Sequence, residues 1–291
     1  MILEKKEKIK PTYVGKNESL VFIVPKELFT MKLNSDQILD HETAIEFSKY
    51  LRGTFKGFQE ANKTKYNNKD NHETETNSEF WSNFEVKARE SGIDLIGYTP
   101  VLENYIFKDL PVVGKNAIVL GMEMKWDKIK TAPSIHCGIE AFRVYYELGQ
   151  KTIELTEFLQ KEGYKSEAHH PFGGKLLFTA HAVSSNLGIM GRNGLVVTPE
   201  FGSRQRWSMI TTDAEIPVRN KVDLSSLEEF CEKCGVCIKS CLGKAAFDNP
   251  IEKVEGSGII THIDRTKCIE SLLENNYCSV CLKVCPQGKK V

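Results

Sequence analysis

The stretch Cys231-Glu-Lys-Cys-Gly-Val-Cys-Ile-Lys-Ser-Cys241 decides the fold of the last part of this chain. Its four cysteines follow the spacing C-x2-C-x2-C-x3-C. A second run, Cys278-Ser-Val-Cys-Leu-Lys-Val-Cys-Pro286, comes later, and Cys268 lies ten positions before it. Eight of the nine cysteines are therefore grouped near the C-terminus, while Cys137 stands alone. Thiols grouped in this way indicate metal or cluster ligands.

Cluster chemistry explains the spacing. A 4Fe–4S cluster takes four thiolates, and a short C-x2-C-x2-C loop can reach three of its corners. In two-cluster ferredoxins the fourth cysteine of each run ligates the other cluster. This rule assigns one cluster to Cys231, Cys234, Cys237 and Cys285. It assigns the second cluster to Cys241, Cys268, Cys278 and Cys281.

Zinc sites and disulfides are the alternatives. Zinc sites commonly pair C-x2-C units about 12 or more residues apart, and the tight triple run fits that pattern poorly. Disulfides are rare in a reducing cytoplasm. The sequence therefore predicts two 4Fe–4S clusters that carry single electrons. The isolated Cys137 is expected to be a small buried apolar side chain rather than a nucleophile.

Composition narrows the function further. Among 291 residues, 39 Lys and Arg balance 39 Asp and Glu, which argues against a nucleic-acid partner because such proteins carry a basic excess. The 41% of hydrophobic residues suffices for a core, and the longest apolar runs are far shorter than the ~20 residues of a membrane span. The first ten residues carry no apolar segment, so we expect no secretory or twin-Arg signal. These features predict a cytoplasmic protein without a membrane partner.

Helical and extended patterns alternate before the cysteine runs. Apolar residues at spacings of three and four predict helices over 40–58, 80–92, 138–162 and 181–190. Short apolar runs predict strands over 19–25, 93–98, 117–121 and 195–198. The almost wholly polar stretch 59–79 is expected to be a mobile linker. The alternation predicts an α/β or α+β fold, with an extension over 1–79, a core over 80–222 and a cysteine-rich module over 223–291.

One part of the predicted core resembles a known superfamily. Residues 182–206 are AVSSNLGIMGRNGLVVTPEFGSRQR, and residues 210–217 are ITTDAEIP. This pattern resembles the reductive dehalogenases and their relatives the epoxyqueuosine reductases, and it is closer to the dehalogenase form. The resemblance covers about residues 80–291. It implies a nitroreductase-like core with a C-terminal two-cluster ferredoxin-like domain.

The resemblance also implies a cofactor. Those families hold cobalamin in its base-off form between the two domains, and their clusters reduce its cobalt to Co(I). The residues that would bind it here are Gly188, Gly191, Arg192, Asn193 and Gly194. Glycine lets the backbone approach a large flat cofactor closely. An ordinary turn between a helix and a strand is the alternative reading of these glycines.

The reductive reaction that the resemblance implies also requires a proton donor. The dehalogenase family uses a tyrosine, and its spacing falls on Tyr145, with Tyr146 as a direct rival. Arg206, or alternatively Arg204, matches the family arginine that would stabilise the phenolate and the departing anion. The alternatives are a tyrosine of the core and arginines of the surface. Further candidates for the pocket, equally compatible with a loop, are His169, His170 and Lys175.

Two functions follow from these features. The first is a cobalamin-dependent reductase, fed by reduced ferredoxin or flavodoxin, that cleaves an organohalide-like or epoxide-like substrate. The second is an iron–sulfur protein that passes electrons to a corrinoid protein or another partner without substrate chemistry of its own. The balanced charge favours a small-molecule substrate over a tRNA.

Overall fold

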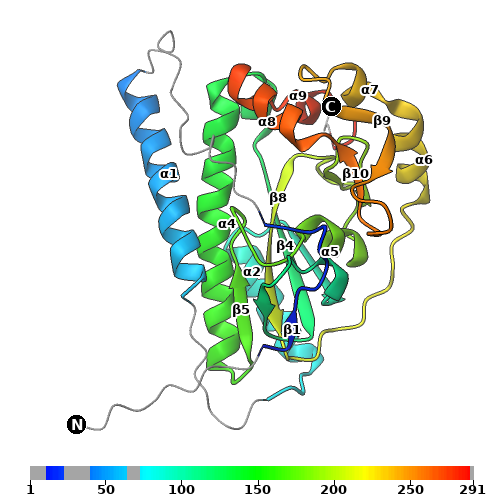
Figure 1. Ribbon diagram of the computed structural model, residues 1–291. Coiled ribbons are helices and arrows are strands. Elements are labelled where there is room, and N and C mark those ends of the chain that lie inside the picture. Colours follow the sequence, from blue (N-terminus) through cyan, green and yellow to red (C-terminus); the bar gives the residue numbers. More distant parts are fainter. Residues whose placement is uncertain (1–10, 23–39, 64–72, 289–291) are drawn as a thin grey trace.

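The computed structural model describes residues 11–22, 40–63 and 73–288. Its centre is an antiparallel sheet with the strand order β2-β4-β8-β5 (Figure 1). The four strands are β2 (Leu95–Pro100), β4 (Asn116–Glu123), β5 (Ser166–His169) and β8 (Gln205–Thr212). Because every pairing is antiparallel, the α+β form of the prediction is the one observed.

Both faces of this sheet are buried. Side chains alternate along a strand, so successive residues of β4 enter different cores. Ile118 and Leu120 pack with α2 (Ser78–Glu90) and α4 (Ile135–Lys161) on one face. Ala117 and Val119 pack toward α5 (Phe178–Ser184) on the other. The shorter elements of this part are β1 (Tyr13–Val14), η2 (Glu103–Tyr105), β3 (Pro111–Val112), α3 (Trp126–Ile129), β6 (Ile189–Met190) and β7 (Val196–Val197).

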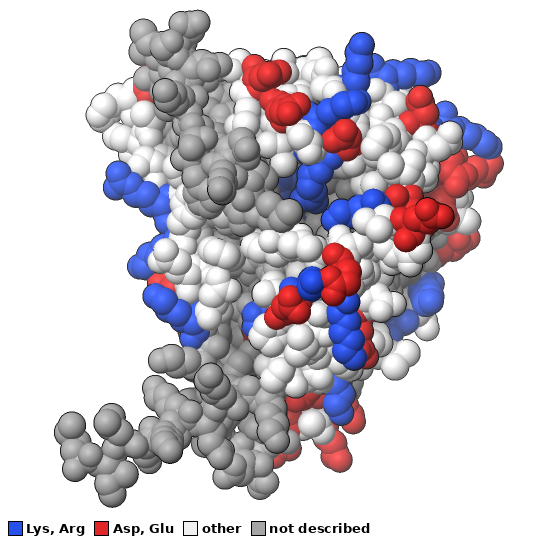
Figure 2. All heavy atoms as spheres, in the orientation of Figure 1, with Lys and Arg blue, Asp and Glu red and all other residues white. Residues whose placement is uncertain are grey.

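The cysteine-rich module lies at one end of the sheet, beside one end of α4 (Figure 1). Its elements are α6 (Ser225–Cys234), α7 (Val236–Lys239), β9 (Ala246–Glu252), β10 (Ile260–Ile263), α8 (Arg265–Glu274) and α9 (Val280–Val284). The ring of Tyr277 packs this module against α4 at Gly138, which has no side chain and so leaves room for the ring. Figure 2 shows acidic and basic side chains intermixed over the visible face.

Capping residues set the ends of the two helices that were expected at 40–58 and 80–92, and both predictions are confirmed. Asp40 accepts a hydrogen bond from the backbone N–H of Thr43 (2.9 Å), which starts α1 (His41–Ala61). Asn77 does the same for Phe80 (2.8 Å) at the start of α2. Gly92 then takes φ +94°, the left-handed conformation that ends a helix.

Helix α1 packs along α4 rather than extending away from the core (Figure 1). Glycines allow the close approach. A side chain at Gly53 would overlap the ring of Tyr146, and one at Gly57 or Gly149 would collide with the imidazole of His170. The segment before residue 80 is thus part of the packed structure over the length of α1.

Three predicted elements differ from the structure. The helix over 181–190 ends at Ser184, because Asn186 takes φ +60° and the backbone N–H of Leu187 bonds back to the carbonyl of Ala182 (3.1 Å). In the strand expected over 19–25, the described residues 19–22 form no strand, and the backbone N–H of Leu20 closes a turn onto Asn17 (3.1 Å); residues 23–25 lie outside the described part.

The mobile linker expected over 59–79 is not found where the structure describes this stretch. Residues 59–61 continue α1, and 64–72 lie outside the described residues. The segment before α2 is fixed by hydrogen bonds, from Glu215 N to Thr74 O (2.8 Å) and from the Tyr164 hydroxyl to Glu75 O (2.9 Å). In both bonds the acceptor is a backbone carbonyl of this segment, so the composition of its side chains did not reveal the contacts. In the described ranges, no helix has the length and apolar character that crossing a membrane requires.

Candidate functional site

Four cysteines from the two runs meet in one hollow. Cys231, Cys234, Cys237 and Cys285 line a space of about 350 Å³, including its open mouth, beside the β6–β7 hairpin. Between α6 and α7 the chain turns at Gly235, whose φ of +60° suits glycine. Burial, together with the nearby thiols of Cys231 and Cys285, raises the pKa of Cys237 to about 11. The structure therefore brings together the four residues that the spacing rule assigned to one cluster.

The other four cysteines form a second group. Burial, together with the charges of Cys268 and Cys278, raises the pKa of Cys281 to about 12. The pKa of Cys268 is likewise raised, first by burial and then by Cys241 and Cys278. These thiols thus lie within electrostatic range of one another, and Cys237 of the first group also lies within range of Cys281. The sulfur of Cys241 also accepts a hydrogen bond from the backbone N–H of Ala245 (3.2 Å), a contact of the kind that tunes cluster potentials.

The cysteines of the first group surround a space rather than a point. Over 11–22, 40–63 and 73–288, no three His, Cys, Asp or Glu side chains form a group that could hold a single metal ion. A cubane cluster carries its irons at separate corners, so its thiolates stand around a body. Cysteine ligates iron as the thiolate. Filling these sites therefore releases protons from thiols whose pKa is raised. The donor set and its arrangement fit two such clusters.

A larger hollow, of about 870 Å³ including its open mouth, lies between the core and the cysteine-rich module. The enclosed part has a volume of about 270 Å³, just below the roughly 300–1,000 Å³ range of small-molecule sites. Its wall combines the loop 171–174, part of β8, and Arg265 at the start of α8. Aromatic side chains supply much of the lining: Phe22, Phe107, Tyr145, Phe172, Phe178 and Trp207.

Two polar atoms of the residues that line this hollow have no partner. The Oε1 of Gln205 and the Nε of Arg206 are buried and make no hydrogen bond within the described ranges. The amide of Gln205 is held in place from its other side, where Nε2 donates to the carbonyl of Val196 (2.8 Å). Buried polar groups are ordinarily paired, so the two atoms are suited to a polar ligand. Cobalamin carries amide side chains that would satisfy both, so these residues fit that cofactor.

Tyr145 and Arg206 face each other at this hollow. The guanidinium carbon of Arg206 lies 5.5 Å from the centre of the Tyr145 ring, within the range of a cation–π interaction. The ring is fixed from behind by edge-on contacts with Phe142 (5.9 Å) and Phe172 (5.8 Å). A guanidinium keeps its charge at any physiological pH, so the hollow has a permanent site for an anion.

The rival residues lie elsewhere. Tyr146 packs its ring against Gly53 of α1, and it is not among the residues that line the hollow. Arg204 is 4% exposed and pairs with Glu123, away from Tyr145. The structure thus places Tyr145 and Arg206 together, and it separates Tyr146 and Arg204 from them.

The five residues expected to bind the cofactor do not line the larger hollow. Gly188 and Gly191 pack tightly on Val197 within the β6–β7 hairpin, and Gly194 takes φ +72° in the turn of that hairpin. The three glycines thus lie in and beside a turn between two strands, and their role toward a cofactor stays a prediction. The remaining two, Arg192 and Asn193, line the first cysteine hollow instead.

Both side chains are engaged in the structure. Arg192 donates to the carbonyls of Glu232 (3.0 Å) and Asp248 (2.5 Å), so it links the hairpin to the cysteine-rich module. The amide of Asn193 donates to the hydroxyl of Ser203 (3.1 Å). Loop 171–174 and Gln205, which line the larger hollow, were not found by sequence reasoning, and no local motif marks them.

The histidines and Lys175 support the hollow from behind. Burial lowers the pKa of His170 to about 3, so the ring is neutral, and its Nδ1 accepts the backbone N–H of Phe172 (3.1 Å). His169 contacts the hydroxyl of Thr211 (3.0 Å), and Lys175 pairs with Glu167. None of these three side chains is in the lining of the hollow.

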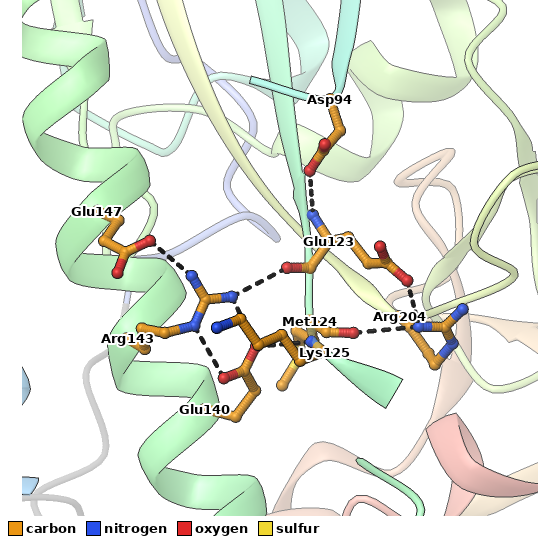
Figure 3. Close-up of polar contacts among 8 residues, drawn as sticks. All are labelled: Asp94, Glu123, Met124, Lys125, Glu140, Arg143, Glu147 and Arg204. Carbon is orange, nitrogen blue, oxygen red and sulfur yellow. Dashed lines mark hydrogen bonds and ion pairs between the residues drawn. The ribbon is translucent and has the colours of Figure 1, made fainter. Parts of the chain in front are cut away.

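A network of charged residues joins α4 to the end of β4 (Figure 3). The buried carboxylate of Glu140 accepts hydrogen bonds from Arg143 (2.6 Å) and from the backbone of Lys125 (2.6 Å). Arg143 also reaches Glu147 (2.6 Å) and the carbonyl of Glu123 (3.3 Å). The network fixes the part of α4 that presents Tyr145. Sequence reasoning missed it, although the spacings of three and four between these charges are a readable signal.

Comparison with known proteins places this geometry in context. No protein-family model matches the chain. A tetrachloroethene reductive dehalogenase of Sulfurospirillum multivorans is 31% identical over 205 residues, which is 63% of this chain and 40% of that protein. An epoxyqueuosine reductase of Lactococcus garvieae is 27% identical over 156 residues, or 50% of this chain and 42% of that one. The chain spans less than half the length of these curated relatives.

Solved structures agree with the sequence comparison. The catabolic reductive dehalogenase NpRdhA superposes with a TM-score of 0.64 at 18% identity, over 71% of this chain and 31% of that one. A crystal structure of an epoxyqueuosine reductase with a tRNA-Tyr stem loop gives a TM-score of 0.50 at 18% identity, over 73% and 66%. The relatives are oxidoreductases, and the resemblance to reductive dehalogenases and epoxyqueuosine reductases is confirmed.

Proposed function

We propose that this chain is a cobalamin-dependent reductase in which two 4Fe–4S clusters pass electrons to a corrin in the larger hollow. The observation that carries the proposal is the pairing of Tyr145 with Arg206 in that hollow, next to the module that holds the cysteines. Arg265, which lines the hollow, lies three residues before the cluster ligand Cys268 on the same helix. Electrons that reach the second cysteine group therefore have a short route to the hollow.

The chain's own residues supply the acid and the anion site. When bound, the corrin supplies a low-potential cobalt through which electrons reach the substrate. Reduction of a carbon–halogen bond consumes two electrons and one proton, forms a carbon–hydrogen bond and releases halide. The phenol of Tyr145 donates the proton, and the guanidinium of Arg206 holds the departing anion. For an epoxide-like substrate, the same two groups would protonate and hold the oxygen that leaves carbon.

The lining indicates the kind of substrate and partner. Aromatic rings and two unpaired polar atoms suit a small molecule bound against the cofactor, and an organohalide-like compound fits the apolar wall best. We propose a cytoplasmic setting in which reduced ferredoxin or flavodoxin supplies the electrons.

Corrin binding separates this function from a simple electron carrier. Protein reconstituted anaerobically with iron and sulfide should bind about one cobalamin per chain and show a base-off absorption spectrum. Replacing Gln205 with leucine removes one acceptor from the hollow and should weaken that binding several-fold, in line with the ~0.5–1.5 kcal/mol of a hydrogen bond. Gln150→Leu, in the groove between α1 and α4, is the matched control and should bind as the parent does. Protein that holds iron but ignores cobalamin would instead be an electron carrier.

A further inference from the structure

The C-terminal tail is held on the core by a buried arginine. The Nη2 of Arg204 donates to the carbonyl of Gly288 (2.7 Å), and Nη1 donates to Glu123 Oε1 (2.6 Å) and to the carbonyl of Met124 (3.1 Å). The guanidinium also lies over the ring of Trp126, 5.4 Å from its centre. One side chain thus joins the tail after α9 to the end of β4 (Figure 3 shows its contacts with β4).

The backbone of the tail lies directly against the core at the same place. Gly202 has φ +59°, and a side chain there would overlap the carbonyl of Gln287 and come within 3.3 Å of the sulfur of Cys285. Gly288 has φ +70°, and a side chain there would overlap the backbone of Phe201. Two glycines in the left-handed conformation therefore let segments 201–202 and 285–288 touch.

The contacts of Arg204 form a clamp between the tail and the end of β4. The end of this clamp at Glu123 is rigid. The backbone N–H of Glu123 is bound by Asp94 (2.8 Å), and its carbonyl is bound by Arg143 of α4 (3.3 Å), as Figure 3 shows. Its carboxylate is then presented to Arg204 from a fixed position. The Glu123 side chain is 36% exposed, but Arg204 is 4% exposed, so its buried charge depends on protein partners rather than on water.

We propose that Arg204, held by Glu123, is a positioning residue that places Cys285 as the fourth ligand of the first cluster; this rests on the cluster assignment made under the proposed function. Three members of the first cysteine group come from a single stretch, 231–237, and position one another locally. Cys285 comes from the other run, three residues before the carbonyl that Arg204 binds. Its place in the group depends on where the tail lies.

Loss of the clamp has a specific chemical consequence. A cubane held by three thiolates has one iron without a cysteine ligand. On mild oxidation that iron leaves as Fe²⁺, one electron passes to the added oxidant, and a 3Fe–4S cluster remains. The oxidised 3Fe–4S cluster has an unpaired electron and gives an electron paramagnetic resonance signal, whereas the oxidised 4Fe–4S cluster gives none. The positioning role therefore has a readout that does not depend on activity.

The test uses the full chain, reconstituted anaerobically and oxidised with ferricyanide. The parent should hold about eight irons, four for each of two clusters. It should give no electron paramagnetic resonance signal after this oxidation. Arg204→Gln should hold about seven irons and show a 3Fe–4S signal approaching one spin per chain. Arg204→Lys keeps the charge but not the forked geometry, so its signal should be intermediate. Glu123→Gln, which leaves Arg204 its bond to Gly288, is the milder variant if Arg204→Gln does not fold.

Arg219→Gln is the matched control. Arg219 also pairs with a glutamate, Glu85, and lies over an aromatic ring, that of Tyr98, but it does not contact the tail. It should behave as the parent does. The positioning role would be overturned if both Arg204→Gln and Glu123→Gln kept their full iron content and gave no 3Fe–4S signal. It would also be overturned if these variants lost all of their iron at once. A parent that does not reach about eight irons would instead contradict the proposed function itself.

Discussion

Replacing Tyr145 with phenylalanine should lower turnover about 10²- to 10⁴-fold, the usual contribution of a positioned general acid. The change removes one hydroxyl and keeps the ring between Phe142 and Phe172, so the hollow keeps its shape. Iron content and cobalamin binding should therefore match those of the parent. Turnover is measured anaerobically with an organohalide probe and a chemical reductant, and the product is quantified.

Tyr146→Phe is the matched control for that experiment. The two tyrosines are adjacent on α4, but the ring of Tyr146 packs on Gly53 of α1. Its hydroxyl should be dispensable for turnover. If Tyr145→Phe retained parental turnover, the acid assigned to this hollow would be wrong. If Tyr146→Phe alone lost activity, the roles of the two residues would be exchanged.

Replacing Cys278 and Cys281 together with serine should abolish turnover. Two thiolates are too few to hold a cubane, so the second cluster should be lost and the iron content should fall from about eight to about four per chain. The first cysteine group does not include either residue, so its cluster should remain. Iron content and electron paramagnetic resonance after dithionite reduction measure both effects.

Cys137→Ala is the control thiol variant. Cys137 is fully buried in the apolar core, and its sulfur contacts the carbonyl of Lys128 (3.5 Å) rather than another cysteine. It should keep about eight irons. Parental iron content in the double serine variant would show that the second group holds no cluster.

The cysteine groups were predictable because ligand spacing is a local property of the sequence. The choice between Tyr145 and Tyr146 was not, since both lie on one helix and only the packing of Tyr146 against Gly53 of α1 separates them. For the same reason Arg204 and Arg206 were interchangeable in sequence. Arg204 bonds to a carbonyl 84 residues away, and no local pattern records such a contact.

The glycines of the β6–β7 hairpin also show what a sequence pattern leaves undecided. Their spacing suggested a surface for a flat cofactor, which stays a prediction, and in the structure Gly188 and Gly191 leave room for Val197 of the neighbouring strand. A missing side chain signals close approach without saying what approaches. The lining of the larger hollow depends on strands and loops that meet only in the folded chain. The nitroreductase-like core and the ferredoxin-like module stay predictions of the resemblance.

Metal and sulfide analysis of protein purified without oxygen tests the central claim most directly. We predict a brown protein with about eight irons and eight inorganic sulfides per chain, as two cubanes require. A colourless protein with zinc in place of iron at its thiols would contradict this account of the site and of the reaction built on it.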